Sequence, residues 1–167
     1  MYTYVIIDDE PLIRRGTKKK LEPLSHLLTC CGEASDGREG LELVRQLKPD
    51  IVILDMQMPV MDGTELLPAL SEEFPSTALI VISGFQNFDY MKQAISSKVI
   101  DYILKPFSKD EIQQTVLKTI DSLKDKEAED HHLTSMVQEK EEAFYSLDLK
   151  LLTDFLLGYT DTAHSSV

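Results

Sequence analysis

The fold is decided by the stretch Ile51-Val52-Ile53-Leu54-Asp55-Met56-Gln57-Met58-Pro59. Its first four residues are apolar and three of them are β-branched, which predicts a short strand buried on both faces of a sheet. The apolar run stops at the carboxylate of Asp55, and Pro59 marks the loop that follows. Open α/β sheets bind their ligands where a parallel strand ends, so Asp55 is a candidate site residue. The alternative interpretation is an aspartate that only solvates the end of the strand.

The same pattern of strand and then helix repeats on both sides of this stretch. The strand-like segments are Tyr2 to Ile7, Leu27 to Ala34, Ile51 to Leu54, Ala78 to Ile82 and Val99 to Leu104. Such alternation predicts a parallel sheet with right-handed crossovers and helices on both faces. We therefore expect an α/β fold of the flavodoxin-like type, a doubly wound five-stranded parallel sheet in the order 2-1-3-4-5.

Three details of the expected helices can be read from the same pattern. Pro68 falls near the end of the first turn of the third helix, where a missing N–H does least damage. In the fourth helix, Phe88, Met91 and Ile95 share one face. Ser108 with Glu111 three residues later predicts a capping box that opens the fifth helix.

Composition excludes several classes of protein. No Gly-rich dinucleotide turn follows the first strand, and no phosphate-loop Gly-Lys-Ser/Thr motif occurs. The net charge of −12 argues against a broad nucleic-acid surface and fits a protein that meets a cation or a basic partner. No apolar run approaches the ~18 residues of a membrane span, and the N-terminus does not have a signal-sequence pattern. We expect a cytoplasmic protein without a membrane partner.

Cys30 and Cys31 are neighbours in a strand, so no disulfide between them is expected.

Polar residues stand at the ends of four of the expected strands. The first strand ends at Asp8 and Asp9, the third at Asp55, the fourth at Ser83 and the fifth at Lys105. In the order 2-1-3-4-5 the first and third strands are neighbours, so three carboxylates converge, and their repulsion raises a pKa or requires a cation. Oxygen ligands of this kind suit Mg²⁺. A carboxylate nucleophile with Mg²⁺, a lysine and a hydroxyl makes a phosphoryl-transfer site with an aspartyl-phosphate intermediate. The alternative for the acids after the first strand is helix capping.

Over roughly residues 2–123 the sequence resembles the receiver domains of two-component response regulators. The motifs that carry the resemblance are Asp8-Asp9, the Asp55 loop that ends in Pro59 and Met61-Asp62-Gly63, Ser83-Gly84, and Asp101-Tyr102-Ile103-Leu104-Lys105-Pro106. Each motif alone is weak, but in this order and at these strand ends they are highly specific. The resemblance implies a CheY-like fold and a phosphoacceptor switch that receives its phosphoryl group from a sensor histidine kinase. Self-phosphotransfer and slow autodephosphorylation would be its only catalysis.

The resemblance also implies which residues hold the metal. Asp55 matches the phosphoacceptor of the family. Asp9, Asp55 and the backbone carbonyl of Gln57 match the direct ligands of Mg²⁺, and Asp8 matches the acid that acts through water.

Three further positions match residues that respond to the phosphoryl group in this family. Lys105 would pair with it, and Ser83 would hydrogen-bond to it and draw the loop of the fourth strand inward. Tyr102 matches the aromatic switch residue, and the Lys105–Pro106 peptide bond is usually cis in the family. Taken singly, a surface lysine, a helix-capping serine and a core tyrosine are the alternatives.

The composition changes after the fifth helix begins. Residues 122–167 hold ten acidic and four basic side chains and no proline. We expect a receiver domain over residues 1–123 and a helical linker over 124–167, with the features of a broken coiled coil and an end at Gly158. Its apolar cluster, which docks on another surface or pairs with itself, comprises Leu147, Leu149, Leu151, Leu152, Phe155, Leu156 and Leu157. A homodimer through the linker or through a face of the receiver is therefore expected.

The segment Ser83 to Tyr90 is similar to receivers found in regulators with an AraC-type DNA-binding domain. That similarity implies a transcriptional output. No helix-turn-helix or basic recognition helix is visible in residues 124–167, so DNA would be bound only through a C-terminal output domain absent from this chain.

Two other functions are compatible with the same motifs. One is a stand-alone receiver whose tail binds a protein. The other is a Mg²⁺-dependent phosphatase that passes through an aspartyl phosphate, as in the haloacid-dehalogenase phosphatases. Those enzymes want a second acid two residues after the nucleophile, and here that position is Gln57, so a general acid is missing.

Overall fold

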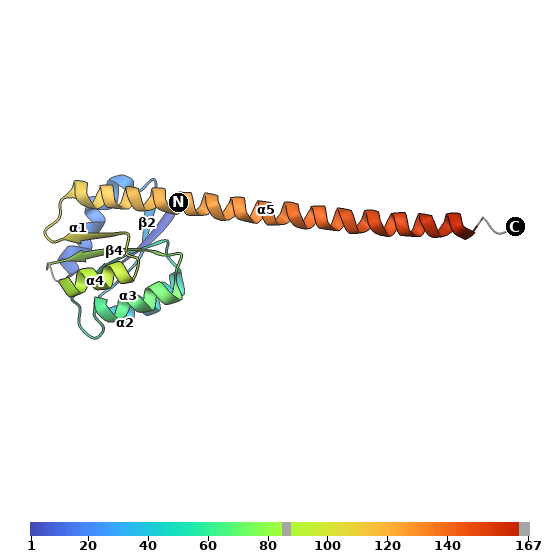
Figure 1. The fold of residues 1–167 in the computed structure, drawn as a ribbon. Helices are drawn as coiled ribbons and strands as arrows, with labels where there is room; N and C mark the ends of the chain where they lie inside the picture. The colour runs from blue at the N-terminus through green and yellow to red at the C-terminus, as the bar shows by residue number, and fades with distance from the viewer. Residues whose placement is uncertain (85–87, 164–167) are drawn as a thin grey trace. The chain divides into compact units, whose positions relative to one another are not determined.

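A computed structural model of the chain describes residues 1–84 and 88–163, with the backbone alone for residues 88, 139 and 141–163. Strands and helices alternate along the chain (Figure 1). The strands are β1 (Tyr2–Ile7), β2 (Leu28–Ala34), β3 (Ile51–Asp55), β4 (Ala78–Ser83) and β5 (Asp101–Leu104). The helices are α1 (Pro11–Leu21), the short 3₁₀ helix η1 (Glu22–Leu24), α2 (Gly37–Leu47), α3 (Gly63–Glu73), α4 (Phe88–Ser96) and α5 (Lys109–Ala163).

The strands form one parallel sheet in the order β2-β1-β3-β4-β5, which confirms the predicted fold. In the register of the central pair, Ile7 lies opposite Leu54, so the residues that follow β1 lie beside Asp55 at the end of β3. All carboxyl ends of the strands meet at one edge because every pairing is parallel. This edge is the one at which doubly wound sheets bind ligands.

Apolar side chains cover both faces of the sheet, as the β-branched runs predict. One layer joins the sheet to α1 and the first turns of α5, and it includes Ile6, Leu21, Ile53, Ile80, Ile112, Val116 and Ile120. The other layer joins the sheet to α2 and α3, and it includes Val5, Val44, Val52, Leu54, Leu66, Leu70 and Val81. Each fully buried side chain of this kind stabilises the fold by about 1.5–3 kcal/mol. Cys30 packs on the first layer and Cys31 on the second, and both are free thiols.

The position of one proline differs from prediction, and the exposed face of α4 adds to what was predicted. Pro68 lies in the second turn of α3, since the helix begins at Gly63. A proline there leaves the carbonyl of Thr64 without its helical donor, and Nε2 of Gln93 donates to that oxygen at 3.3 Å. Met91 and Ile95 of α4, which the sequence pattern placed on one face, are exposed. Periodicity places residues on one face of a helix but does not say what covers that face.

The capping box of α5 forms as predicted. The amide of Ser108 donates to Oε2 of Glu111 at 2.7 Å, and the amide of Glu111 donates to Oγ of Ser108 at 3.1 Å. The predicted helix end at Gly158 is wrong, because α5 continues to Ala163. One glycine inside a helix costs only about 1 kcal/mol relative to alanine, which does not end it.

The chain divides into two compact units, residues 1–123 and 124–167. In the second unit Leu133, Met136 and Val137 are exposed. The predicted cluster from Leu147 to Leu157 lies outside the residues whose side chains are described. Within the described part of the chain, none of the helices has the length and apolar content needed to cross a membrane.

Candidate functional site

Charged side chains meet at the carboxyl edge of the sheet. Nζ of Lys105 lies 2.8 Å from Oδ2 of Asp8 and 2.8 Å from Oδ2 of Asp55, and 3.5 Å from Oε1 of Glu10. Asp8 and Asp55 are buried, with 2% and 4% of their surface exposed. The ammonium therefore bridges two buried carboxylates from neighbouring strands.

The local backbone places each of these three groups. The amide of Asp8 donates to the carbonyl of Ala34 on β2 at 3.1 Å, and Oδ1 of Asp8 accepts from the amide of Glu10 at 2.8 Å. Asp55 is the last residue of β3, where a fully buried apolar run ends. The amide of Lys105 donates to the carbonyl of Ser83 at 2.8 Å. The peptide bond from Lys105 to the following proline is cis, as the family resemblance implies.

The charges in this cluster shift one another's proton affinity. Burial raises the pKa of Asp8 above its usual value, although hydrogen bonds from Lys105 and from the amide of Glu10 oppose the shift. Burial alone would lower the pKa of Lys105. The hydrogen bonds to Asp55 and Asp8 outweigh burial, so that pKa lies above its usual value. Lys105 is therefore held as a cation, while a full negative charge on Asp8 is disfavoured in the folded chain.

The acids at this edge fit a divalent cation. One carboxylate oxygen each from Asp8, Asp9, Glu10 and Asp55 lie within 4.8 Å of one another, and Asp9 and Glu10 are exposed. Carboxylate oxygens in this number, partly open to water, are the ligands that Mg²⁺ prefers. Four acids gather here, and the ammonium of Lys105 contacts three of them, so a cation would relieve the remaining repulsion.

Glu10 is a member of this cluster that the sequence interpretation did not single out. Its signal was present, because three consecutive acids are more than one helix cap requires. The capping alternative fails at Glu10 itself, which precedes α1 without a side-chain cap hydrogen bond. Gln57 is exposed, and its amide donates to Oδ1 of Asp55 at 3.3 Å.

Ser83 lies on β4, a neighbour of β3 in the sheet, and Tyr102 lies on β5, the strand beyond it. Ser83 is fully buried and follows Ile82, the residue of β4 that pairs with Asp55. Tyr102 is half-buried on β5 and packs against the core layer formed with α2 and α3. The structure thus brings Asp8, Asp9, Asp55 and Lys105 together at one point, with Ser83 at the same edge and Tyr102 further back along β5.

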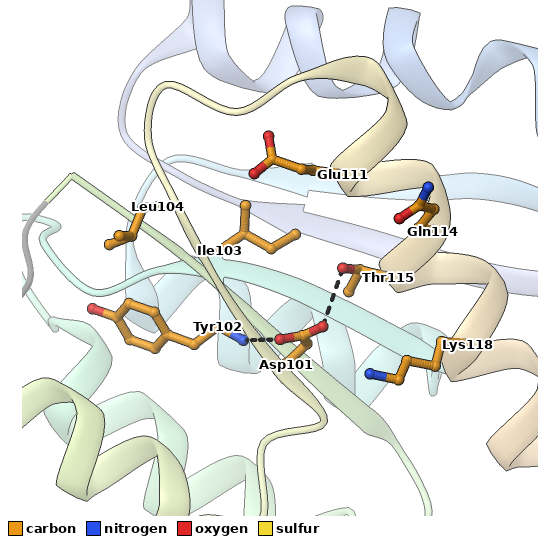
Figure 2. A pocket seen from close by; sticks show the side chains of 8 residues that line it. All are labelled: Asp101, Tyr102, Ile103, Leu104, Glu111, Gln114, Thr115 and Lys118. Atoms are coloured by element: carbon orange, nitrogen blue, oxygen red, sulfur yellow. Dashed lines mark hydrogen bonds between the residues drawn. The ribbon is translucent and has the colours of Figure 1, made fainter.

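Asp101 beside Tyr102 ties β5 to α5. One carboxylate oxygen of Asp101 accepts from the amide of Tyr102 at 2.9 Å, and the other accepts from Oγ1 of Thr115 at 3.2 Å (Figure 2). Figure 2 shows the ring of Tyr102 pointing away from these contacts. The side chains around them line a hollow of about 490 Å³: Asp101, Tyr102, Ile103, Leu104, Glu111, Gln114, Thr115 and Lys118.

Comparison with known proteins agrees with this geometry. The family model described as "Response regulator receiver domain" matches residues 4–117. The transcriptional regulatory protein YesN of Bacillus subtilis is 38% identical over 124 residues, which cover 74% of this chain and 34% of that protein. The transcriptional regulatory protein HptR of Staphylococcus aureus is 37% identical over 106 residues, which cover 64% of this chain and 41% of that protein. The chain thus spans between a third and two-fifths of the length of these relatives.

Solved structures with the same fold include receivers of other regulators. The receiver domain of AraT, a response regulator from Geobacillus stearothermophilus, is 33% identical with a TM-score of 0.71. The match covers 75% of this chain and 98% of that one. A CheY-like receiver domain protein from Methanospirillum hungatei matches at a TM-score of 0.70 with 21% identity, a likeness of fold alone. With its sheet order, its acidic edge and its matched family model, this chain belongs to the response regulator receiver domains of two-component systems.

Proposed function

We propose that Asp55 accepts a phosphoryl group from a sensor histidine kinase and that the modified domain switches an output. The observation that carries the proposal is the position of Lys105, whose Nζ lies 2.8 Å from both Asp8 and Asp55. This arrangement puts a fixed positive charge beside the one carboxylate that ends a strand at the centre of the sheet. Positive charge at that point stabilises the negative charge of a transferred phosphoryl group.

Each of the site residues would have a separate role in such a transfer. An oxygen of Asp55 attacks phosphorus as the bond from phosphorus to the histidine nitrogen breaks, and an aspartyl phosphate forms. Asp9, Asp55 and the backbone carbonyl of Gln57 would hold Mg²⁺, with Asp8 acting through water. When bound, the ion supplies charge neutralisation at the phosphoryl oxygens. Lys105 pairs with one of those oxygens.

The test is phosphorylation of the chain by acetyl phosphate or a phosphohistidine donor, with and without Mg²⁺. Wild-type protein is expected to gain one acid-labile phosphoryl group per chain, detected by intact mass, only when Mg²⁺ is present. Asp55→Asn abolishes the label, whereas Asp36→Asn, a matched change at the exposed cap of α2, keeps it. Label that persists in Asp55→Asn at the wild-type level contradicts the assignment. Continuous turnover of a phosphomonoester would favour a phosphatase instead.

Phosphorylation then acts through Ser83 and Tyr102. Ser83 is buried at the end of β4, and its hydroxyl would bond the phosphoryl group in the modified state alone. A modification shifts an equilibrium only through such differential contacts. Ser83→Ala is expected to accept phosphate yet lose the phosphate-dependent changes in the NMR spectrum around Tyr102. Equal spectral changes in Ser83→Ala and wild type would exclude this coupling.

The output we propose is transcription, through a DNA-binding domain C-terminal to this chain. The names of YesN and HptR, of which the chain spans a minor part, support this reading. A homodimer would form through the helical linker of residues 124–167, where Leu133 and Val137 are exposed, or through the receiver face that exposes Met91 and Ile95. Sedimentation of the chain beside a version ending at Ser122 separates the two. A dimer that persists in the shorter chain assigns the interface to the receiver.

A further inference from the structure

Arg14 connects the acidic edge to the second strand. Its Nη1 donates to the backbone carbonyl of Asp8 at 2.6 Å, and its Nε donates to Oε2 of Glu33 on β2 at 3.3 Å. Its side chain is 17% exposed. Lys18, one turn further along α1, also pairs with Glu33. The guanidinium is thus held at two of its nitrogens, by the carboxylate of Glu33 on β2 and by the carbonyl of Asp8, which follows β1.

The carbonyl that Arg14 holds belongs to the peptide unit between Asp8 and Asp9. Asp8 is tied at its amide to Ala34 and at its carboxylate to Lys105 and to the amide of Glu10. The bond from the amide of Glu10 closes a turn around the peptide that leads to Asp9, but none of those bonds reaches the oxygen of that peptide. Because a peptide unit is planar, a bond to its oxygen also sets the direction of the next residue.

We propose that Arg14 is a positioning residue for the acidic edge. It holds the Asp8–Asp9 peptide so that the two carboxylates keep the spacing that a divalent cation requires. The role in cation binding rests on the proposed function, whereas the contacts of Arg14 with Asp8 and Glu33 belong to the chain itself. Residues that orient metal ligands without touching the metal typically lower metal affinity by about 10–100-fold when they are removed.

Positioning and simple charge repulsion predict opposite changes in cation affinity when Arg14 is removed. Removing a positive charge near a cation site strengthens cation binding if the charge acts only by repulsion. If Arg14 positions the peptide, removing it weakens binding. Arginine donates to Glu33 and to Asp8 from two nitrogens held in a planar fork, whereas a lysine would have to reach both acceptors from one nitrogen.

The experiment compares Mg²⁺ binding by calorimetry in wild type, Arg14→Ala, Arg14→Lys and Arg15→Ala. Arg15 is the matched control, since it is the next residue of α1, carries the same charge and is exposed. We expect Arg14→Ala to weaken binding about tenfold, Arg14→Lys to fall between it and wild type, and Arg15→Ala to bind as tightly as wild type or more so. Glu33→Gln, which frees the far end of the guanidinium, is expected to weaken binding less than Arg14→Ala.

A second measurement needs no metal. NMR relaxation of the backbone amides of Asp9 and Glu10 in the metal-free protein is expected to show lower order in Arg14→Ala than in Arg15→Ala. Unchanged amide order together with Mg²⁺ binding as tight as in Arg15→Ala overturns the inference. If wild type binds no Mg²⁺, the proposed function fails, and the amide order alone decides whether Arg14 holds the peptide.

Discussion

Two groups of ion pairs in the receiver have similar distances and opposite surroundings. Nζ of Lys105 lies 2.8 Å from Asp8 and from Asp55, whose side chains are 3% and 6% exposed. On α2 and α3, Nη1 of Arg45 lies 2.6 Å from Oε1 of Glu42, and Nη2 lies 2.6 Å from Oε1 of Glu73. These three side chains are about half exposed. Distance alone would rank these groups as equals.

The two groups of ion pairs differ in their exposure to solvent. The charges around Arg45 stay hydrated in the folded chain, so their pairing adds little to stability. The charges around Lys105 have lost most of their water, and each depends on the others for compensation. The repulsion among the acids also remains, because Asp9 and Glu10 lie in the same cluster. We infer that the buried group is kept for its chemistry and that it lowers the stability of the metal-free fold.

The largest expected difference between the two groups comes from removing the cation. Lys105→Met leaves two buried carboxylates without a cationic partner, which is expected to destabilise the metal-free protein by about 3 kcal/mol at neutral pH. Arg45→Met leaves two solvated carboxylates and is expected to change stability within the scatter of the measurement. Urea unfolding of both variants beside wild type makes the comparison. Equal losses in the two variants would show that burial does not distinguish the groups.

Alkaline pH separates the two groups in a second way. The pKa of Lys105 is raised in the folded chain, so its contribution is fully present below the unfolded pKa of about 10.5 and is lost as pH rises through the folded value. In that window the stability of wild type is expected to fall by up to about 1.4 kcal/mol per pH unit from this group. Unfolding free energies measured across the window give the slope, and Lys105→Met is expected to lack this component. An identical slope in that variant would assign the alkaline loss to other groups.

The smallest expected effect concerns the loop after Asp55. Val60 has a φ of 69°, in the left-handed region that a β-branched residue rarely adopts. Val60→Gly is expected to stabilise the protein by about 0.5–1 kcal/mol, because relief of strain exceeds the added chain entropy. Val60→Ala, which keeps a Cβ, is expected to give less than half of that gain. Urea midpoints measure both variants, and a loss of stability in Val60→Gly would mean that the loop is not strained.

The sequence was most informative where an apolar run stops at a charged residue. Asp8, Asp55 and Lys105 were predicted because each follows a strand, and strand ends of a parallel sheet meet at one edge. Glu10 was missed because a third acid before a helix looks like part of a cap. Arg14 was missed because nothing in a basic helix shows that one of its side chains turns back to a strand end.

The helices were less predictable for a related reason. The spacing of Met91 and Ile95 describes their common face correctly, but exposure depends on which element packs there. The end of α5 was misplaced because a glycine outside a tight turn does not by itself end a helix. Periodicity is a local property, whereas coverage and termination depend on partners distant in sequence.

The central claim is that the buried acids lower stability until a cation binds. The raised pKa of Asp8 means that its contribution favours folding below its unfolded pKa and is lost as pH rises through the folded value, so at pH 7 its charge is unfavourable. Asp8→Asn keeps the shape and an acceptor oxygen for Lys105 but removes one charge. The decisive measurement is urea unfolding of wild type and Asp8→Asn at pH 7, each with and without saturating Mg²⁺. Without Mg²⁺ the variant is expected to be more stable by about 0.5–2 kcal/mol.

With Mg²⁺, wild type is expected to gain more than the variant, so that the difference closes or reverses, because a ligand stabilises the form that binds it better. A wild type that is already the more stable of the two without Mg²⁺, with equal gains for both when it is added, would contradict the account.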